Sequence, residues 1–174
     1  AWSVVDVSSS SKLSSVFFTG YGTGWIVGEH GTMLRCVDAG GTWMDMTQGP
    51  RRRLISVSFV DEQRGWAVSM EGDILRTSDG GSHWASTDAQ GSLAGVWFAD
   101  TLLGWTWGYD GQLRKSSDGG ITWSVQHSTS GCPLLGTCFL GRNRVWICGG
   151  GGTMLSSTTG GETWASSTGL SPCC

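Results

Sequence analysis

Two series of tryptophans recur along this 174-residue chain at nearly constant spacing, and they constrain its fold more than any other feature. Neighbours in each series are 39 or 41 residues apart. The first series is Trp25, Trp66, Trp105 and Trp146, and the second is Trp2, Trp43, Trp84, Trp123 and Trp164. A fixed period of this size is the signature of a repeat architecture. The chain is therefore built from four copies of one unit.

Each copy carries the pattern of four short β-strands. The first strands are expected at 13–18, 54–59, 93–98 and 134–139, and the second strands at 24–28, 65–69, 104–108 and 145–149. A third strand follows a tight glycine turn, and the fourth begins at the second tryptophan series. The 29 glycines and the 14% of charged residues suit tight turns and aromatic-packed strands rather than helices. The sequence predicts an all-β fold, a β-propeller of four four-stranded blades.

The length favours a single domain over residues 1–174. We expect an N-terminal strand at 1–7, repeats at about 13–47, 54–88, 93–127 and 134–168, and a cysteine-containing tail at 169–174. The start at Ala1 fits cleavage after a targeting segment, ordinary removal of Met or a trimmed chain.

The turn between the third and fourth strands has a recurring chemistry. It runs from Asp38 to Trp43, Asp79 to Trp84, Asp118 to Trp123 and Thr159 to Trp164. An Asp at the start of such a turn accepts hydrogen bonds from backbone N–H groups ahead of it, and Gly takes positive φ. We therefore interpret these acids as structural, and we expect the fourth turn, where Thr159 replaces Asp, to be the weakest.

These turns resemble the Asp-box, or bacterial neuraminidase repeat, which the segment from Ser116 to Trp123 matches in full. The longer unit adds Val-x-Phe, Gly-Trp-x-Val-Gly and Gly-Thr-x-Leu-Arg before the box. Over residues 2–168 it resembles the photosystem II stability and assembly factor family of cyanobacteria and plastids. That family has about seven blades, so this chain is a compact four-bladed relative, an open arc completed by a partner, or a fragment.

The resemblance implies a non-enzymatic protein in the thylakoid lumen, peripheral to the membrane. It would bind photosystem core or assembly-intermediate subunits, most readily those of photosystem II, as an assembly factor or as a permanent subunit. No cofactor is implied. The alternative is a secreted or periplasmic Asp-box protein that binds carbohydrate or hydrolyses glycosides.

Composition agrees with a protein partner. The formal charge is −3, with nine Arg and two Lys, so no basic field points to nucleic acid. No apolar run is long enough to span a membrane. The three His residues occupy unrelated repeat positions, and no catalytic or metal-binding motif is present. We therefore expect no enzyme activity and no metal site.

Two groups of arginines are candidate partner-binding residues. Arg51, Arg52 and Arg53 lie in the loop between the first and second repeats, and such a run suits contacts with carboxylates. Arg35, Arg76 and Arg114 lie at equivalent or nearly equivalent places on the third strands. The alternatives are a solvated charge run for the first group and pairing with a neighbouring carboxylate for the second.

Six cysteines, an even number, favour an oxidising compartment. Cys138 and Cys148 form a cross-strand disulfide or are two small buried residues. The tail cysteines, Cys173 and Cys174, are candidates to pair with Cys36 or Cys132. Two further tryptophans, Trp97 and Trp107, lie outside both series and are either buried in the third blade or exposed to a partner.

Overall fold

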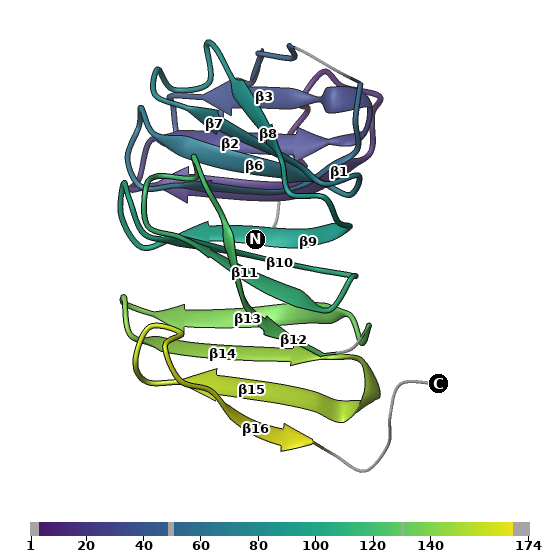
Figure 1. Cartoon of the computed structure of the whole chain (residues 1–174). Helices are drawn as coiled ribbons and strands as arrows, with labels where there is room; N and C mark the ends of the chain where they lie inside the picture. The colour runs from purple at the N-terminus through teal and green to yellow at the C-terminus, as the bar shows by residue number, and fades with distance from the viewer. Residues whose placement is uncertain (1–3, 49–50, 130, 169–174) are drawn as a thin grey trace. The chain divides into compact units, whose positions relative to one another are not determined.

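The computed structural model describes residues 4–48, 51–129 and 131–168, and these residues form four antiparallel sheets of four strands each (Figure 1). Blade 1 contains β1 (Leu13–Thr19), β2 (Thr23–Gly28), β3 (Met33–Cys36) and β4 (Met44–Asp45). Blade 2 contains β5 (Leu54–Phe59), β6 (Gly65–Ser69), β7 (Asp73–Thr77) and β8 (Ala85–Asp88). The strands follow one another in sequence order within each sheet.

Blades 3 and 4 repeat this order. Blade 3 contains β9 (Leu93–Phe98), β10 (Gly104–Gly108), β11 (Gln112–Ser116) and β12 (Ser124–Ser128). Blade 4 contains β13 (Leu134–Leu140), β14 (Arg144–Gly149), β15 (Thr153–Ser157) and β16 (Ala165–Thr168). Single 3₁₀ turns, η1 (Glu29–Gly31) and η2 (Gly150–Gly152), follow β2 and β14. The predicted all-β, four-bladed propeller class is confirmed.

The chain divides into two compact units where the sequence predicted one domain. The first unit, Ala1–Asp88, holds blades 1 and 2, and the second, Ala89–Cys174, holds blades 3 and 4. The boundary falls between two repeats because each repeat is a complete sheet and the linker after β8 belongs to no strand.

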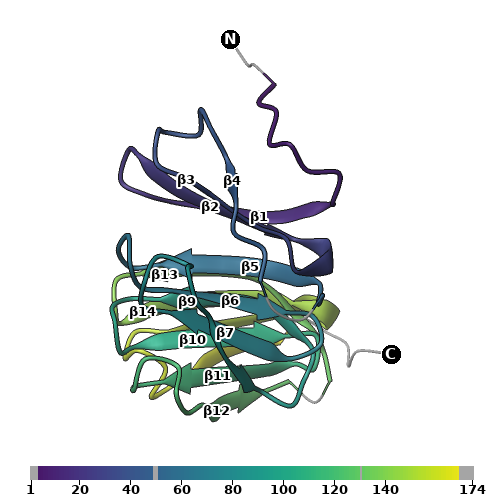
Figure 2. The ribbon, with the colours of Figure 1, turned by 90° about the horizontal axis from the view of Figure 1, so that it is seen from above.

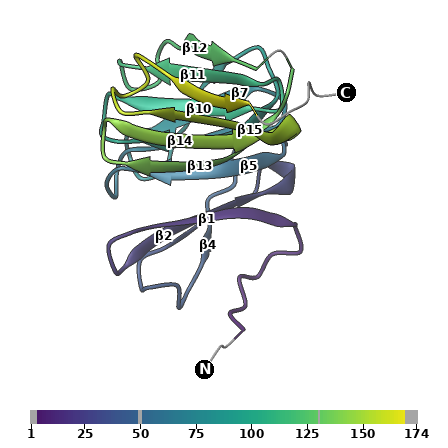
Figure 3. The same cartoon turned by 90° about the horizontal axis from the view of Figure 1, so that it is seen from below.

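The N-terminal strand expected at residues 1–7 is not formed by residues 4–7, which lie in an irregular segment that extends to Lys12. Residues 1–3 are outside the described residues. Figures 2 and 3 show this segment leaving β1 on the side of blade 1 that faces away from β5. The fourth strand of blade 1 is β4, which pairs with β3 at the other edge of the sheet.

Every blade has two faces, which strand alternation separates. We call the face that carries the first tryptophan series the trailing face and the face that carries the second series the leading face. In blade 1 the trailing face includes Trp25, Val27 and Met33, and the leading face of blade 2 includes Leu54, Val57 and Phe59. These six side chains form one buried cluster, the core of the first unit. The hydrophobic core thus lies between blades.

The second unit has the same core made from the same positions. The trailing face of blade 3 contributes Trp105, Trp107 and Leu113, and the leading face of blade 4 contributes Leu134, Ile147 and Leu155. The two tryptophans outside the main series are therefore both packing residues. Trp107 is buried, and Trp97 stacks on Phe139 with ring centroids 4.2 Å apart.

A glycine opposite a phenylalanine sets the packing on the leading face. Phe59 pairs with Gly65, and a Cβ atom built on Gly65 would lie 2.4 Å from the Phe59 ring. With the space open, Phe59 lies flat against Trp25, centroids 3.6 Å apart and planes 11° apart. In blade 4 the glycine is replaced by Val145, and Phe139 stacks on Trp97 instead of on Trp105.

Neither alternative for Cys138 and Cys148 is correct, because no disulfide joins them and both free thiols are exposed rather than buried. The register of the β13–β14 hairpin, in which Leu140 pairs with Arg144, places Cys148 opposite Gly136 and Cys138 opposite Trp146. The two cysteines are therefore diagonal neighbours and not a directly opposed pair.

The other two cysteines among the described residues differ in their bonding state. Cys36 is a buried free thiol, and Cys132 is disulfide-bonded. The expected tail cysteines, Cys173 and Cys174, are outside the described residues.

Replacing Gly65 by Ala should destabilise the first unit. The new methyl group would force the Phe59 ring away from Trp25, and overpacking of this kind costs about 1–3 kcal/mol. Gly22→Ala is the control, because the nearest atom to its Cβ is a carbonyl oxygen 3.8 Å away. Urea unfolding followed by tryptophan fluorescence measures both variants, and equal stability of the two would contradict the stated role of Gly65.

Candidate functional site

The Asp-box turns are closed by hydrogen bonds from the backbone to one carboxylate and one hydroxyl. Asp118 Oδ1 accepts from the N–H groups of Ile121 and Thr122, and Ser116 Oγ accepts from the N–H of Gly120 at 2.8 Å. The indole N–H of Trp123 then donates to the Gly120 carbonyl. The hydrogen bonds that the Asp118 carboxylate accepts thus come from its own turn.

The second and fourth turns show how the network varies. Asp79 accepts from the N–H of His83, and Thr77 takes the place of Ser116. In the fourth turn the hydroxyl of Thr159 accepts from the N–H of Thr163 at 2.9 Å, so one of the backbone contacts survives the loss of the carboxylate.

These hydrogen bonds change the acidity of the carboxyl groups. The N–H and the side chain of His83 lower the pKa of Asp79 to about 2 from an ordinary 3.8. The hydroxyl and N–H of Thr122 lower the pKa of Asp118 to about 2 in the same way. A carboxyl group with such a pKa is ionised at neutral pH and cannot supply a proton there. The structural interpretation of these acids follows from the geometry.

The blades of each unit are joined by the Trp of one blade and the Asp-box of the next. The indole N–H of Trp25 donates to the Gly80 carbonyl at 3.1 Å, and the guanidinium of Arg35 lies over the Trp25 ring, 5.7 Å from its centroid. Gly80 has φ +72°, and a Cβ there would lie 2.9 Å from the Glu62 carbonyl oxygen. Glycine therefore leaves room for the Glu62 carbonyl of the same blade and for the Arg35 guanidinium of blade 1.

Lysine takes the arginine position in the second unit, which the sequence alignment missed. Lys115 faces Trp105 on the neighbouring strand, as Arg35 faces Trp25 and Arg76 faces Trp66. Its Nζ donates to the Gly160 carbonyl at 2.8 Å and lies 5.8 Å from the Trp105 ring centroid.

Arg114 is one residue out of register with Arg35 and Arg76, which corrects its expected place among them. It faces Thr106 on the leading face and is buried, with 4% of its surface exposed. Its guanidinium donates to Asp110 Oδ2 at 2.6 Å. Arg114 is therefore a structural residue that no partner can reach. The other repeats have Leu34, Leu75 and Leu155 at this position.

The loop of Arg51, Arg52 and Arg53 is exposed and well anchored. The Arg52 carbonyl accepts from the N–H of Gly31 at 2.7 Å, and the Arg53 carbonyl accepts from the N–H of Met70 at 3.0 Å. The loop is thereby tied both to the η1 turn of blade 1 and to blade 2. The sequence placed this loop correctly between the first two blades.

Two of the three guanidinium groups already have carboxylate partners. Arg52 lies 3.3 Å from Asp73, and Arg53 lies 3.7 Å from Glu29. Both arginines remain almost half exposed, so these pairs are solvent-screened and weak. Arg51 takes part in none of the ion pairs formed among the described residues. The loop therefore presents one uncommitted cation beside two that can exchange partners.

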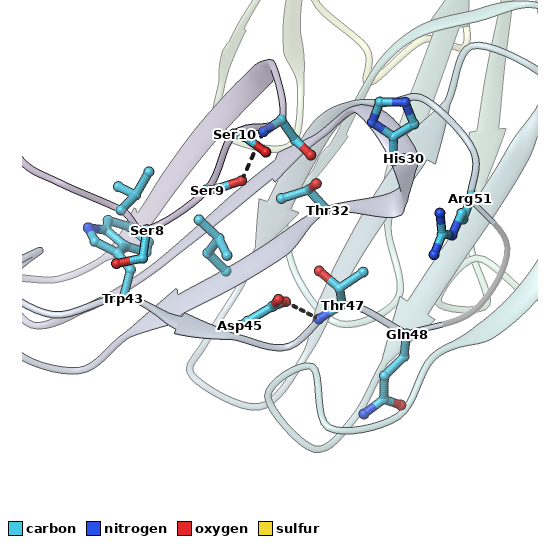
Figure 4. A pocket seen from close by; sticks show the side chains of 13 residues that line it. Ser8, Ser9, Ser10, His30, Thr32, Trp43, Asp45, Thr47, Gln48 and Arg51 are labelled. Atoms are coloured by element: carbon cyan, nitrogen blue, oxygen red, sulfur yellow. Dashed lines mark hydrogen bonds between the residues drawn. The ribbon is translucent and has the colours of Figure 1, made fainter.

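Arg51 also lines a pocket of about 520 Å³ in the first unit (Figure 4). Its other walls are the irregular N-terminal segment and the leading face of blade 1, with Leu34, Trp43 and Asp45. The remaining lining residues are Val7, Ser8, Ser9, Ser10, Ser11, His30, Thr32, Thr47 and Gln48. The Asp45 carboxylate accepts from the N–H of Thr47. The pocket is therefore the polar margin of an open blade face.

No metal site is evident: among the described residues, no group of three or more His, Cys, Asp or Glu side chains is placed to hold a metal ion. The described residues also contain no helix of the length and apolarity needed to cross a membrane.

The sequence of this chain matches a known protein family. Residues 1–96 match the family model of the photosynthesis system II assembly factor YCF48. The match covers the whole first unit, including the Arg51–Arg53 loop. No curated protein matches the chain.

Solved structures show the same fold at low identity. A YCF48 bound to a D1 peptide is 18% identical over 97% of this chain and 86% of its own, with a TM-score of 0.65. YCF48 from Cyanidioschyzon merolae is 17% identical over 94% and 87%, with a TM-score of 0.62. A GH74 xyloglucanase from Xanthomonas campestris is 14% identical over 93% of this chain but 31% of its own, with a TM-score of 0.72.

The lowered pKa values predict how stability depends on pH. Because the folded-state pKa values of Asp79 and Asp118 lie below 3.8, their contribution is complete above about pH 4 and is lost as pH falls toward about 2. Thermal unfolding followed across this range should show a falling midpoint. The double variant Asp79→Asn/Asp118→Asn should show a shallower fall, and an unchanged slope would mean that other carboxyl groups govern acid unfolding.

Removing the partner of Arg114 should be costly. Asp110→Ala leaves a buried guanidinium without its counter-charge, and the expected loss is about 3 kcal/mol, the lower end of the usual range because Asp110 is partly exposed. The double variant Asp110→Ala/Arg114→Leu restores the leucine of the other repeats and should recover most of this loss in urea unfolding. A double variant as unstable as Asp110→Ala would show that the loss does not come from an unpaired charge.

Proposed function

The chain belongs to the family of the photosynthesis system II assembly factor YCF48, and from this we propose that it binds photosystem II subunits during their assembly without catalysing a reaction. The observation that carries the proposal is the extent of the family match. It spans residues 1–96, more than half of the chain, and therefore both blades of the first unit together with the loop that joins them.

The kind of partner follows from the relatives and from the charge of the loop. One relative of the same fold was solved with a D1 peptide bound. We propose that this chain also takes a protein segment from a photosystem II core subunit or assembly intermediate. A segment with carboxylate groups suits Arg51, Arg52 and Arg53, because guanidinium groups bind carboxylates through paired hydrogen bonds.

The structure supports the loop as the binding element in two ways. Its backbone is fixed by the hydrogen bonds to Gly31 and Met70, so little order has to be gained on binding. Its ion pairs with Asp73 and Glu29 are longer than a hydrogen-bonded contact, so a partner carboxylate can replace them at little cost. Arg35 and Lys115, by contrast, are engaged in packing between blades.

The absence of catalysis is part of the proposal. The acids of the first three Asp-boxes, Asp38, Asp79 and Asp118, accept hydrogen bonds within their own turns, and Asp79 and Asp118 are ionised at neutral pH. They therefore support a fold and not an acid–base reaction. The rival function is carbohydrate binding or glycoside hydrolysis. It is supported only by similarity of fold, because the xyloglucanase is 14% identical to this chain.

We propose the thylakoid lumen as the location. A lumenal protein meets photosystem II at the membrane surface, and the family role requires such a meeting. The disulfide-bonded state of Cys132 supports an oxidising compartment.

The proposal is tested by binding to solubilised thylakoid membranes. The tagged chain should retain photosystem II subunits in a fixed ratio, and it should bind peptides from a set that covers D1 in fluorescence anisotropy. The variant Arg51→Glu/Arg52→Glu should lose at least tenfold in affinity, because two attractive contacts become repulsive.

The matched control is Arg142→Glu/Arg144→Glu, which changes the net charge equally. It also combines one arginine paired with a carboxylate, Arg142 with Asp100, and one that takes part in no ion pair among the described residues. If both variants bind like the parent, the loop is not the site. If the parent itself retains no photosystem II subunit but binds or cleaves glycans, the proposed function is wrong and the rival takes its place.

A further inference from the structure

Two blade faces that form the core elsewhere in the chain are exposed in this structure. One is the leading face of blade 1, and the other is the trailing face of blade 4. In the cores of both units, a trailing face packs on the leading face of the next blade. The two exposed faces are therefore complementary by repeat position.

The leading face of blade 1 repeats the apolar surface of blade 2. Leu13, Val16 and Phe18 occupy the positions of Leu54, Val57 and Phe59 on the first strand. Val16 is 59% exposed and Phe18 is 40% exposed, whereas Val57 and Phe59 are 4% and 3% exposed. The pocket beside Arg51 is the margin of this same face.

This face is covered only in part, because Ile26 and Leu34 on it are 7% and 3% exposed while Val16 and Phe18 remain open. Residues 4–12 contain no strand, and Val4 and Val5 on that segment are themselves exposed. A second apolar pocket, lined by Leu13, Val16 and Ile26, remains open on the same face.

The trailing face of blade 4 repeats the surface by which blade 1 contacts blade 2. Trp146, Cys148 and Met154 occupy the positions of Trp25, Val27 and Met33. Met33 is 4% exposed and Met154 is 46% exposed. Ser156 replaces the Arg35 of blade 1, so the arginine that lies over Trp25 has no counterpart here. Arg144 occupies the position of Thr23 at the edge of the same face.

The polar anchor of the interface is also preserved. Trp25 docks by donating to the carbonyl of Gly80 in the next Asp-box, where φ is +72°. Ala39 stands at this position in the Asp-box of blade 1 and keeps a left-handed φ of 59° although it is not glycine. Blade 1 therefore presents the backbone conformation to which a tryptophan such as Trp146 docks.

We propose that these two faces bind each other between chains, so that the trailing face of blade 4 in one copy packs on the leading face of blade 1 in a second copy. The occupant is a second copy because the matching chemistry is on the chain itself, and the contact continues the interface already formed within both units. Such a contact is head to tail. We call the trailing face of blade 4 the donor face and the leading face of blade 1 the acceptor face, and each copy offers one of each. This self-association does not depend on the proposed photosystem role.

The stoichiometry is measured by light scattering after size exclusion over a range of concentrations. The wild-type chain should have at least twice the single-copy mass of 18.4 kDa. Val16→Glu on the acceptor face and Met154→Glu on the donor face should each reduce it to one copy. Ile121→Glu is the control, because Ile121 is equally exposed but lies in a turn outside both faces, and it should stay associated.

Mixing the two variants tests the head-to-tail geometry. Val16→Glu keeps an intact donor face and Met154→Glu keeps an intact acceptor face, so an equimolar mixture should recover a two-copy species. A contact that uses the same face of both copies would not be rescued in this way. Circular dichroism of each variant confirms that a loss of association is not a loss of fold.

The free thiols give an independent footprint. Cys138 and Cys148 are on the donor face and should react with N-ethylmaleimide several-fold more slowly in the associated wild type than in Val16→Glu, with the buried Cys36 as internal reference. A wild-type chain that is monomeric at every concentration overturns the proposal. This holds whether Cys138 and Cys148 react rapidly or are protected because the donor and acceptor faces of the same copy pack on each other. Failure of the mixture to re-associate overturns the head-to-tail contact.

Discussion

The approach of a tryptophan to a glycine turn is the constraint on which both units depend. In the first unit, Trp25 lies between the Phe59 ring and the Gly80–Gly81 turn, stacked on one and hydrogen-bonded to the other. Missing side chains make room around both contacts, since Gly65 leaves space for the Phe59 ring and Gly80 leaves space for the Glu62 carbonyl and the Arg35 guanidinium. The 29 glycines of the chain are thus not only turn formers, because some of them create the flat surfaces on which indole rings pack.

A residue that differs between repeats is accompanied by a compensating contact at another repeat position. Val145 replaces the glycine that faces Phe139, and Phe139 then stacks on Trp97, the only tryptophan at a position that holds Phe17, Ser58 and Cys138 in the other blades. Lys115 replaces arginine and takes the Gly160 carbonyl, and the indole N–H of Trp105 is left buried without a hydrogen-bond partner among the described residues. The second unit therefore conserves the arrangement of surfaces rather than individual contacts, as interfaces between stacked repeats allow.

The strands, the blade number and the Asp-box turns could be predicted from the sequence because they depend on local spacing. The errors arose where one residue of register decides the outcome, since a shift by one moves a side chain to the other face of a strand. Aligning Leu113-Arg114 with Leu34-Arg35 placed Arg114 on the wrong face, whereas pairing with Trp105 identifies Lys115 as the equivalent residue. Likewise, the register of the β13–β14 hairpin pairs Cys138 with Trp146 and Cys148 with Gly136, so the two cysteines are not opposed. The position of the Arg51–Arg53 loop between blades 1 and 2 could be predicted because it depends on the repeat boundaries and not on strand register.

The two ends of a repeat protein ordinarily carry polar faces, since an end face has no further repeat to cover it. Here the two end faces have the composition of interior ones, with Val16 and Phe18 at one end and Trp146 and Met154 at the other. Exposed apolar faces of this kind are interaction surfaces in folded proteins. The arginine loop borders one of these faces, because Arg51 lines the pocket at the margin of the leading face of blade 1. The two proposed contacts therefore differ in chemistry, since partner binding would use the charges of the loop and self-association would use the apolar side chains of the repeat.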